Sequence, residues 1–596
     1  MNAPFKTDAL PEWRLDDLYA DREDPRIAAD MAEAERLNGE LARLEGRLVA
    51  TRGRPAELGG IIDRGIELYE QATNAMSSVG AYASLSASVA RDDPAWSKFE
   101  ADLRARSAQI ASLSLFFTLE INKLDDVELE AALKAHKAAQ RWRPWLRRVR
   151  ASRPHELSPD LEKLLLDKAP ASANWGRLSD ETLAKLSARV GGETLTLPQL
   201  LNRTSSPDPA QRKAAAGALA KALADRAPTL ALSLNTLAFE KQVEDRWRKF
   251  SNPAAGRHLA NEVDADAVEA LEAAVVDGYA AVSHRYYALK ARALGRTHLD
   301  HWDRNSPLDT AQPRLYSWDE AKSVVLESFE ALAPRFAETA QVFFHQPWID
   351  ARPRPGKQSG AYSHSVTATR HPYVFMNYMG ERRDVLTLAH ELGHAVHQTL
   401  CKPLGTLLAD TPLTLAETAS IFGEGLVFEK LLAEASPRER RGLLAGKIED
   451  GINTVVRQIA FHRFETRFHA ARLHGELSAD EIGNLWMEIM SESLGPAVRL
   501  DKGYRHYWAY VSHFVHAPFY VYAYAFGDLL VRGLMEKRRE DPKAFAPLYE
   551  KLLAGGGAKT YVEALAPFGL NPREKAFWTA GVTQLERLVD EFAALV

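Results

Sequence analysis

The chain has 596 residues, of which 46% are hydrophobic and 26% are charged, as is ordinary for a soluble globular protein. Its net charge of −5 provides no basic field, so we expect no nucleic-acid partner. We expect no membrane partner either, because no apolar run is long enough to cross a bilayer and the first residues show no secretory signal. The single cysteine, Cys401, excludes an internal disulfide and suits a reducing compartment, so we expect a cytoplasmic location and a small buried side chain.

The N-terminal part of the chain is predicted to form a helical bundle. Segments with apolar residues at three- and four-residue spacing indicate long antiparallel helices. The long segments cover residues 29–50, 61–88 and 96–121, and two further helical regions cover about residues 125–143 and 158–168. We expect Pro144 to end the fourth of them, and the alternation from Gly191 to Leu197 predicts the first strand.

A loop-like segment at residues 204–209 is the best internal boundary. We therefore predict a helical N-terminal domain over residues 1–204 and a second domain over residues 205–596, which holds the chemical motifs described below. The same segment could instead be a hinge within one fold. Ser317 and Glu320 then form the S-x-x-E pattern of a capping box, which predicts the start of a helix.

Two short strands are predicted shortly before residue 380, at residues 363–368 and 373–378. One of them could present unpaired N–H and C=O groups to an extended peptide. An ordinary covered hairpin explains these residues equally well.

The pattern H-E-x-x-H at residues 390–394 is the most specific chemical signal in the chain. On a helix, His390 and His394 lie one turn apart on the same face, where two neutral imidazoles can share one Zn²⁺. Glu391 lies beside them and can reach a water on the metal. An apolar run with stop signals around Pro403 places the motif inside one helix. Buried core histidines with a buried acid would leave a costly carboxylate without an evident partner, so we favour a metal site.

A catalytic zinc site typically has three protein ligands and a water, so the motif needs one more ligand. Glu417 is the best candidate, because it follows His394 by 23 residues, enough for a loop and a returning helix. It could instead form a T-x-x-E capping box with Thr414. Glu424 could hold a ligating histidine through its second nitrogen or could be solvated. His397 is expected to pack or to form a hydrogen bond.

Residues 513–527 combine histidines with tyrosines. Pro518 suits the first turn of a helix, which would place Tyr520 and Tyr524 one turn apart. A tyrosine O–H, or an N–H of His513, could stabilise the oxyanion that develops on a zinc-bound carbonyl. An aromatic core stripe explains the same residues about as well.

Four segments together resemble the oligoendopeptidase F group of the thimet oligopeptidase family of zinc metallopeptidases. They cover residues 356–361, 390–397, 417–420 and 519–522. The resemblance implies a mainly α, clam-like helical body with a deep central channel and a small β-hairpin or sheet beside the zinc helix. The channel would admit short peptides and exclude folded proteins. Gln358 stands where this family usually has arginine, and His516 stands where a tyrosine is common. These two departures do not affect the expected metal site. Because of them, the resemblance indicates neither the substrate preference nor which residue is the oxyanion donor.

The resemblance also implies roles for individual residues. Some would form a zinc site and its general base, and others would lie near the carbonyl of the bond being cleaved. These are His390, His394 and Glu417 as zinc ligands, Glu391 as base, and His513 with Tyr520 or Tyr524 near the carbonyl. The predicted function is a zinc-dependent endopeptidase that hydrolyses internal bonds of short oligopeptides. Two alternatives remain, a zinc carboxypeptidase of similar helical fold and a peptide-binding protein without catalysis. The sequence indicates neither the preferred side chains nor the oligomeric state.

Overall fold

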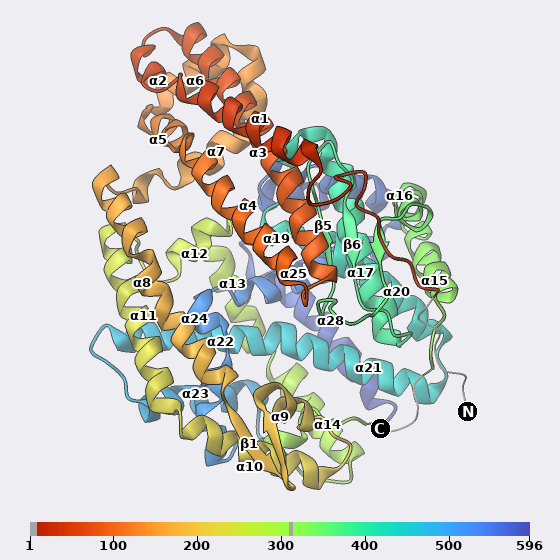
Figure 1. Ribbon diagram of the computed structural model, residues 1–596. Helices are drawn as coiled ribbons and strands as arrows, with labels where there is room; N and C mark the ends of the chain where they lie inside the picture. Colours follow the sequence, from red (N-terminus) through yellow and green to blue (C-terminus); the bar gives the residue numbers. More distant parts are fainter. Residues whose placement is uncertain (1–8, 309–313) are drawn as a thin grey trace. The chain divides into compact units, whose positions relative to one another are not determined.

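The computed structural model describes residues 9–308 and 314–596, and these form mainly α-helices with three small sheets (Figure 1). The mainly α prediction is therefore confirmed. Packing divides the chain into two compact units, each assembled from three segments. The first unit consists of Met1–Arg153, Pro313–Leu431 and Lys537–Gly569, and the second of Pro154–Gln312, Leu432–Glu536 and Leu570–Val596. The domain boundary at residue 204 remains a prediction. No helix in the described ranges is long and apolar enough to span a membrane.

The N-terminal segment of the first unit is helical, as its apolar spacing predicts. Its helices are α1 (Pro25–Ala42), α2 (Arg47–Ala50), α3 (Pro55–Val89), α4 (Pro94–Ser112), α5 (Leu115–Lys123), α6 (Asp126–Ala135) and α7 (Arg143–Ala151). Three of them, α1, α3 and α4, carry proline in the first turn, where its missing N–H breaks no helical hydrogen bond. Pro144 also lies in a first turn, that of α7. The prediction that Pro144 ends a helix was therefore wrong, because α6 already stops at Ala135.

A three-stranded sheet in the first unit has the order β4-β6-β5. β4 (Ile349–Asp350) runs parallel to β6 (Tyr373–Phe375), and β5 (Tyr362–His364) pairs with β6 antiparallel in the register Ser363↔Val374. The hairpin of β5 and β6 was predicted, whereas β4 was not, because two residues carry no readable alternation. The segment before α1 packs against this sheet, where the centroids of the Trp13 and Phe375 rings are 5.6 Å apart.

Further helices complete the first unit. They are α15 (Trp318–Glu330), α16 (Pro334–His345), α17 (Arg382–Cys401), α18 (Thr406–Ala409), α19 (Leu413–Ala416), α20 (Thr418–Glu434), α26 (Pro542–Leu553) and α27 (Tyr561–Leu565). Of these, α17 packs against β5 and β6. The predicted capping box starts α15: the Glu320 N–H donates to Ser317 Oγ, and the Ser317 N–H donates to the Glu320 carboxylate. The only cysteine, Cys401, is buried at the end of α17, as predicted.

The second unit is also mainly helical. Its first helices are α8 (Pro159–Ala184), α9 (Leu197–Arg203), α10 (Pro209–Ala224), α11 (Ala227–Trp247), α12 (Ala255–Ala260), α13 (Ala265–Asp277) and α14 (Arg285–Ala293). The later ones are α21 (Pro437–Gly451), α22 (Arg457–Arg472), α23 (Ala479–Leu494), α24 (His513–His516), α25 (Tyr522–Glu540, which ends in the first unit) and α28 (Lys575–Ala593). Its strands are β1 (Ser187–Val190) with β2 (Glu193–Thr196), antiparallel, and β3 (Leu299–Asp300) with β7 (Val498–Arg499), parallel.

Candidate active site

The H-E-x-x-H motif lies in the middle of α17, as the sequence predicts. The helix begins after a capping box formed by Glu381 and Asp384, and it ends at Cys401, directly before the predicted stop signals. His390 and His394 lie one turn apart, and the centroids of their rings are 5.0 Å apart. The intervening Glu391 is only 5% exposed. The local sequence thus places two imidazoles and a buried carboxylate on one short stretch of helix.

A glycine lets the next helix approach this stretch closely. A Cβ atom at Gly393 would lie 2.5 Å from the backbone oxygen of Ala419 and 2.8 Å from the Cα atom of Ser420. A Cβ atom at Gly423 would likewise lie 3.1 Å from the backbone oxygen of Ala389. Helices α17 and α20 therefore pack backbone to backbone, side by side in Figure 1, and Glu417 directly precedes α20.

The three candidate ligands converge on one point. The Nε2 atoms of His390 and His394 each lie 3.4 Å from Oε2 of Glu417, and one ligand atom from each residue falls within 4.8 Å of the other two. Tetrahedral zinc with bonds of about 2.0–2.1 Å places neighbouring ligand atoms about 3.3 Å apart. Both the donor types, two imidazole nitrogens and a carboxylate oxygen, and their spacing therefore fit a zinc ion.

Polar contacts orient two of these ligands. The Nδ1 atom of His390, on the far side of its ring, lies 3.5 Å from Oε2 of Glu424, and Ser420 Oγ donates to Oε2 of Glu417 at 2.7 Å. The alternative capping box is not formed. Glu417 follows the last residue of α19, and the buried Thr414 hydroxyl makes no hydrogen bond to any described residue. His397 is buried, and burial lowers its pKa to about 4, consistent with the predicted packing role.

The charges of this group stabilise one another. Burial disfavours the charged form of Glu417, but His394 and His390 outweigh burial and lower the Glu417 pKa to about 2. Burial also disfavours protonation of His390, yet Glu424 and Glu417 raise its pKa to about 9. A protonated His390 thus offsets part of the negative charge of these carboxylates, so a divalent cation bound between the ligands would displace its proton.

Burial raises the pKa of Glu391, against the opposing effect of the two neighbouring histidines. The backbone of Ser363 in β5 also lowers the pKa of this carboxyl, against the effect of burial. The Ser363 carbonyl accepts a hydrogen bond from Nε2 of Gln398 at 3.3 Å. Side chains of α17 therefore cover the outer edge of β5 at this residue, which favours a covered hairpin there over addition of a peptide strand.

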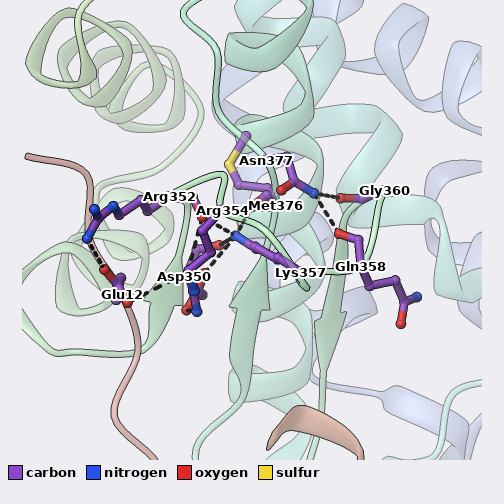
Figure 2. A network of polar contacts seen from close by, with 9 residues as sticks. All are labelled: Glu12, Asp350, Arg352, Arg354, Lys357, Gln358, Gly360, Met376 and Asn377. Atoms are coloured by element: carbon purple, nitrogen blue, oxygen red, sulfur yellow. Dashed lines mark hydrogen bonds and ion pairs between the residues drawn. The ribbon is translucent and has the colours of Figure 1, made fainter. Parts of the chain in front are cut away.

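A buried ion pair anchors the loop that leads into β5 (Figure 2). The Lys357 ammonium lies 2.6 Å from Oδ1 of Asp350 and donates to the backbone carbonyls of Asp350, Arg352 and Met376 at 3.2, 3.1 and 2.6 Å. Arg354 binds the two carboxylate oxygens of Asp350 at 2.8 Å each. Both side chains of the Lys357–Asp350 pair are fully buried, and burial lowers the pKa of Lys357. In the sequence this loop is marked only by the family resemblance, and the ion pair was not predicted.

The same loop is tied to its neighbours through Gln358. The side-chain amide of Asn377 donates to the backbone carbonyls of Gln358 and Gly360 at 3.0 and 3.1 Å (Figure 2). The Gln358 side chain accepts a hydrogen bond from Nε of Arg91 at 3.0 Å. A guanidinium from the connection between α3 and α4 thus contacts the Gln358 side chain.

His513, Tyr520 and Tyr524 form a ring cluster in the second unit. The His513 and Tyr520 rings are stacked, with their centroids 6.0 Å apart, and the centroids of the Tyr520 and Tyr524 rings are 5.5 Å apart. Nε2 of His513 is 3.0 Å from the Tyr524 hydroxyl oxygen. The prediction that Pro518 opens a helix was wrong, because α25 begins only at Tyr522 and Pro518 lies in a turn before it. The two tyrosines therefore meet across a turn rather than along one helix.

The fold and the donor set define a mainly α-helical protein with an H-E-x-x-H metal centre, the arrangement of a helical metallopeptidase. The sequence model described as peptidase family M3 matches residues 203–583, and a second one, oligopeptidase F, matches residues 120–187. The chain belongs to peptidase family M3 and is a metallo-oligopeptidase. The family resemblance drawn from the four sequence segments is therefore confirmed.

Individual relatives agree with this assignment. Oligopeptidase PepF of Bacillus subtilis is 24% identical over 502 residues, which cover 82% of this chain and 74% of the relative. Group B oligopeptidase PepB of Streptococcus agalactiae is 24% identical, with 84% of each chain covered. A crystal structure from Chlamydophila abortus shares the fold over all of both chains, with a TM-score of 0.85 and 20% identity. The crystal structure of oligoendopeptidase-F from Enterococcus faecium shares the fold over 96% of this chain and 99% of the other chain, with a TM-score of 0.71 and 20% identity.

Proposed function

We propose that this protein is a zinc-dependent endopeptidase that hydrolyses internal peptide bonds of short oligopeptides in the cytoplasm. The observation that carries the proposal is the convergence of His390, His394 and Glu417 on one point, with the buried Glu391 beside them. The names of the relatives, oligopeptidase PepF and oligoendopeptidase-F, support oligopeptides as the substrate class.

The three ligands would hold Zn²⁺, which when bound lowers the pKa of a water toward about 7 and polarises the peptide carbonyl. Glu391 acts as general base: it accepts a proton from the attacking water and later delivers it to the leaving amine nitrogen. Its burial suits this role, because a carboxylate with little solvation accepts a proton readily.

The ring cluster supplies the second part of the proposed chemistry. A hydroxyl of Tyr520 or Tyr524, or an N–H of His513, donates a hydrogen bond to the carbonyl oxygen of the bond being cleaved. Such a donor stabilises the negative charge that develops on this oxygen as water attacks. The hydrogen bond between His513 and Tyr524 would hold the tyrosine hydroxyl in a defined direction.

Digestion of a mixed peptide library, with and without a zinc chelator, tests the proposal. We expect internal cuts, seen by mass spectrometry, that stop with the chelator and return with added Zn²⁺. Trimming of single residues from the C-terminus would instead support a carboxypeptidase. Binding of peptides without any cleavage would support a non-catalytic peptide-binding protein.

The Glu391→Gln variant provides the matched control in this digestion. It should keep its zinc, measured by metal analysis, yet lose about 10²- to 10⁴-fold in kcat, as expected for removal of a general base. Substantial cleavage by this variant would refute the assignment of Glu391 as base.

A further inference from the structure

The turn that carries Tyr520 has a backbone conformation that its own sequence would not select. The Tyr520 N–H donates to the carbonyl of Ala517 at 3.1 Å, so residues 517–520 form a β-turn with Pro518 and Phe519 at its centre. Phe519 has φ +60°. Proline followed by a residue with positive φ is the pattern of a type II turn, which favours glycine or asparagine at the second position. A phenylalanine there is strained and persists only where its surroundings hold it.

One face of α22 holds Phe519 in this conformation. Oε1 of Glu465 accepts a hydrogen bond from the Phe519 N–H at 2.8 Å. His462 and His469 lie one turn to either side of Glu465, and their rings are 5.9 and 4.9 Å from the Phe519 ring. All four side chains are buried. A single helical stripe thus binds both the backbone and the ring of the strained residue.

Helix α12 fixes the residues on either side of Phe519. Nε of Arg257 donates to the carbonyl of Pro518 at 3.2 Å, and the guanidinium lies 5.6 Å from the centre of the Tyr520 ring. The hydroxyl of Tyr522, at the start of α25, lies within hydrogen-bond distance of two further side chains near α12. The turn is therefore held from two helices.

Because Tyr520 directly follows Phe519, the backbone at Phe519 decides where the Tyr520 ring lies relative to His513 and Tyr524. We propose that Glu465 is a positioning residue for the ring cluster: by accepting the Phe519 N–H it maintains the turn and thereby orients the tyrosine hydroxyls toward the substrate carbonyl. This inference rests on the proposed function, in which the cluster contacts that carbonyl.

The Glu465→Leu variant tests the inference, because leucine fills the site without accepting a hydrogen bond. We expect kcat to fall by about 10- to 100-fold, the effect of misplacing a reacting group by about an ångström, while KM changes little. Zinc content should not change, since the candidate ligands belong to the first unit. Glu465→Gln keeps an acceptor oxygen in the same place and should restore most of the lost kcat. If the leucine variant does not fold, Glu465→Met tests the same loss with a more adaptable side chain.

Ile459→Ala serves as the matched control for lost stability, because Ile459 is fully buried on the same helix. It should lower the Tm without lowering kcat at temperatures where it stays folded. An equal loss of kcat in Ile459→Ala and Glu465→Leu at equal Tm would overturn the positioning role.

A double-mutant cycle separates this inference from the proposed function. Tyr520→Phe and Tyr524→Phe identify the hydroxyl whose loss lowers kcat, and Glu465→Leu is then added to that variant. If Glu465 acts through this hydroxyl, the added loss is small; if the two losses multiply, or if Glu465→Leu alone keeps full kcat, the inference fails while the proposed function stands. If His513→Ala and both tyrosine variants all keep full kcat, the proposed role of the ring cluster fails instead.

Discussion

Glu424 contacts His390 on the side of the imidazole ring that faces away from the other candidate ligands, with Oε2 at 3.5 Å from Nδ1. A carboxylate in this position fixes the ring orientation and makes the other nitrogen a better ligand. We therefore expect Glu424→Gln to weaken zinc affinity by about 10- to 100-fold, measured by competition with a chromogenic chelator. Glu429→Gln, on the same helix but paired with Arg538 and Arg539, is the control. Equal zinc affinity in both variants would contradict an orienting role for Glu424.

Glu417→Ala should abolish stable zinc retention, because only two imidazoles would remain as protein ligands. Metal analysis after dialysis measures the loss. Thr414→Val is the control: the Thr414 hydroxyl makes no hydrogen bond to a described residue, so its removal should leave the zinc content unchanged. Full zinc retention in Glu417→Ala would show that Glu417 is not a ligand.

Gly393→Ala should both destabilise the protein and weaken zinc binding. The added methyl group would meet the backbone of α20 at Ala419, and backbone cannot move aside as a side chain can. We expect a loss of about 1–3 kcal/mol in the free energy of unfolding, the usual cost of overpacking, together with weaker zinc affinity because Glu417 moves with α20.

Gly446→Ala is the matched control for this prediction. Gly446 is exposed inside α21, and a methyl group there would meet no other atom within 4 Å. It should instead increase the free energy of unfolding by about 0.5–1 kcal/mol, through the better helix propensity of alanine. If both alanine variants change stability in the same direction, close packing at Gly393 is not what makes glycine necessary.

Lys357→Met should cost about 3–5 kcal/mol in the free energy of unfolding, because it leaves the carboxylate of Asp350 buried and short of one cation. Urea titration followed by circular dichroism measures the change. Lys98→Met breaks the exposed pair with Asp102, and its cost should not exceed about 1 kcal/mol. A similar small cost at Lys357 would show that Arg354 alone satisfies Asp350.

The stability of the protein should depend on the protonation of Glu465. Burial raises the pKa of this carboxyl to about 8, although Phe519 N–H, Arg257 and Lys241 oppose the shift. In the unfolded chain the pKa is about 4.3, so between these values the folded state binds a proton that the unfolded state does not. The contribution of Glu465 to the free energy of unfolding therefore falls as pH rises through this window, and this contribution is lowest above pH 8.

Glu465→Gln removes this titration. Its stability advantage over the parent protein should grow as pH rises from 5 to 8, by at most about 1.4 kcal/mol per unit, and urea titrations at each pH measure it. Contributions of His462 and His469 are common to both proteins and cancel. A difference that does not vary with pH would mean that Glu465 ionises equally in both states.

Several features of the site are readable from the sequence because they depend on neighbouring residues. The capping box at Ser317, the stop signals after Cys401 and the four-residue spacing of His390 and His394 act over one or two helical turns. The choice of Glu417 followed from the need for a third ligand and a returning helix. The resemblance of four short segments then indicated the family.

Other features depend on contacts between distant segments. The ion pair of Lys357 with Asp350 has no pattern at fixed spacing, and the need for glycine at Gly393 arises only when α20 packs against α17. The error at Pro518 has the same origin, because proline alone suits either the first turn of a helix or a β-turn.

By itself, then, the sequence determined the helix that carries the H-E-x-x-H motif, the pairing of its two histidines on one face and the metallopeptidase class, since these are encoded by spacing along a single helix. Only the tertiary structure decided how Glu417 and Glu424 meet His390 and how the turn at Phe519 is shaped. Its positive φ is maintained by Glu465, which lies 54 residues earlier in the chain, and local propensity alone would have disfavoured that conformation.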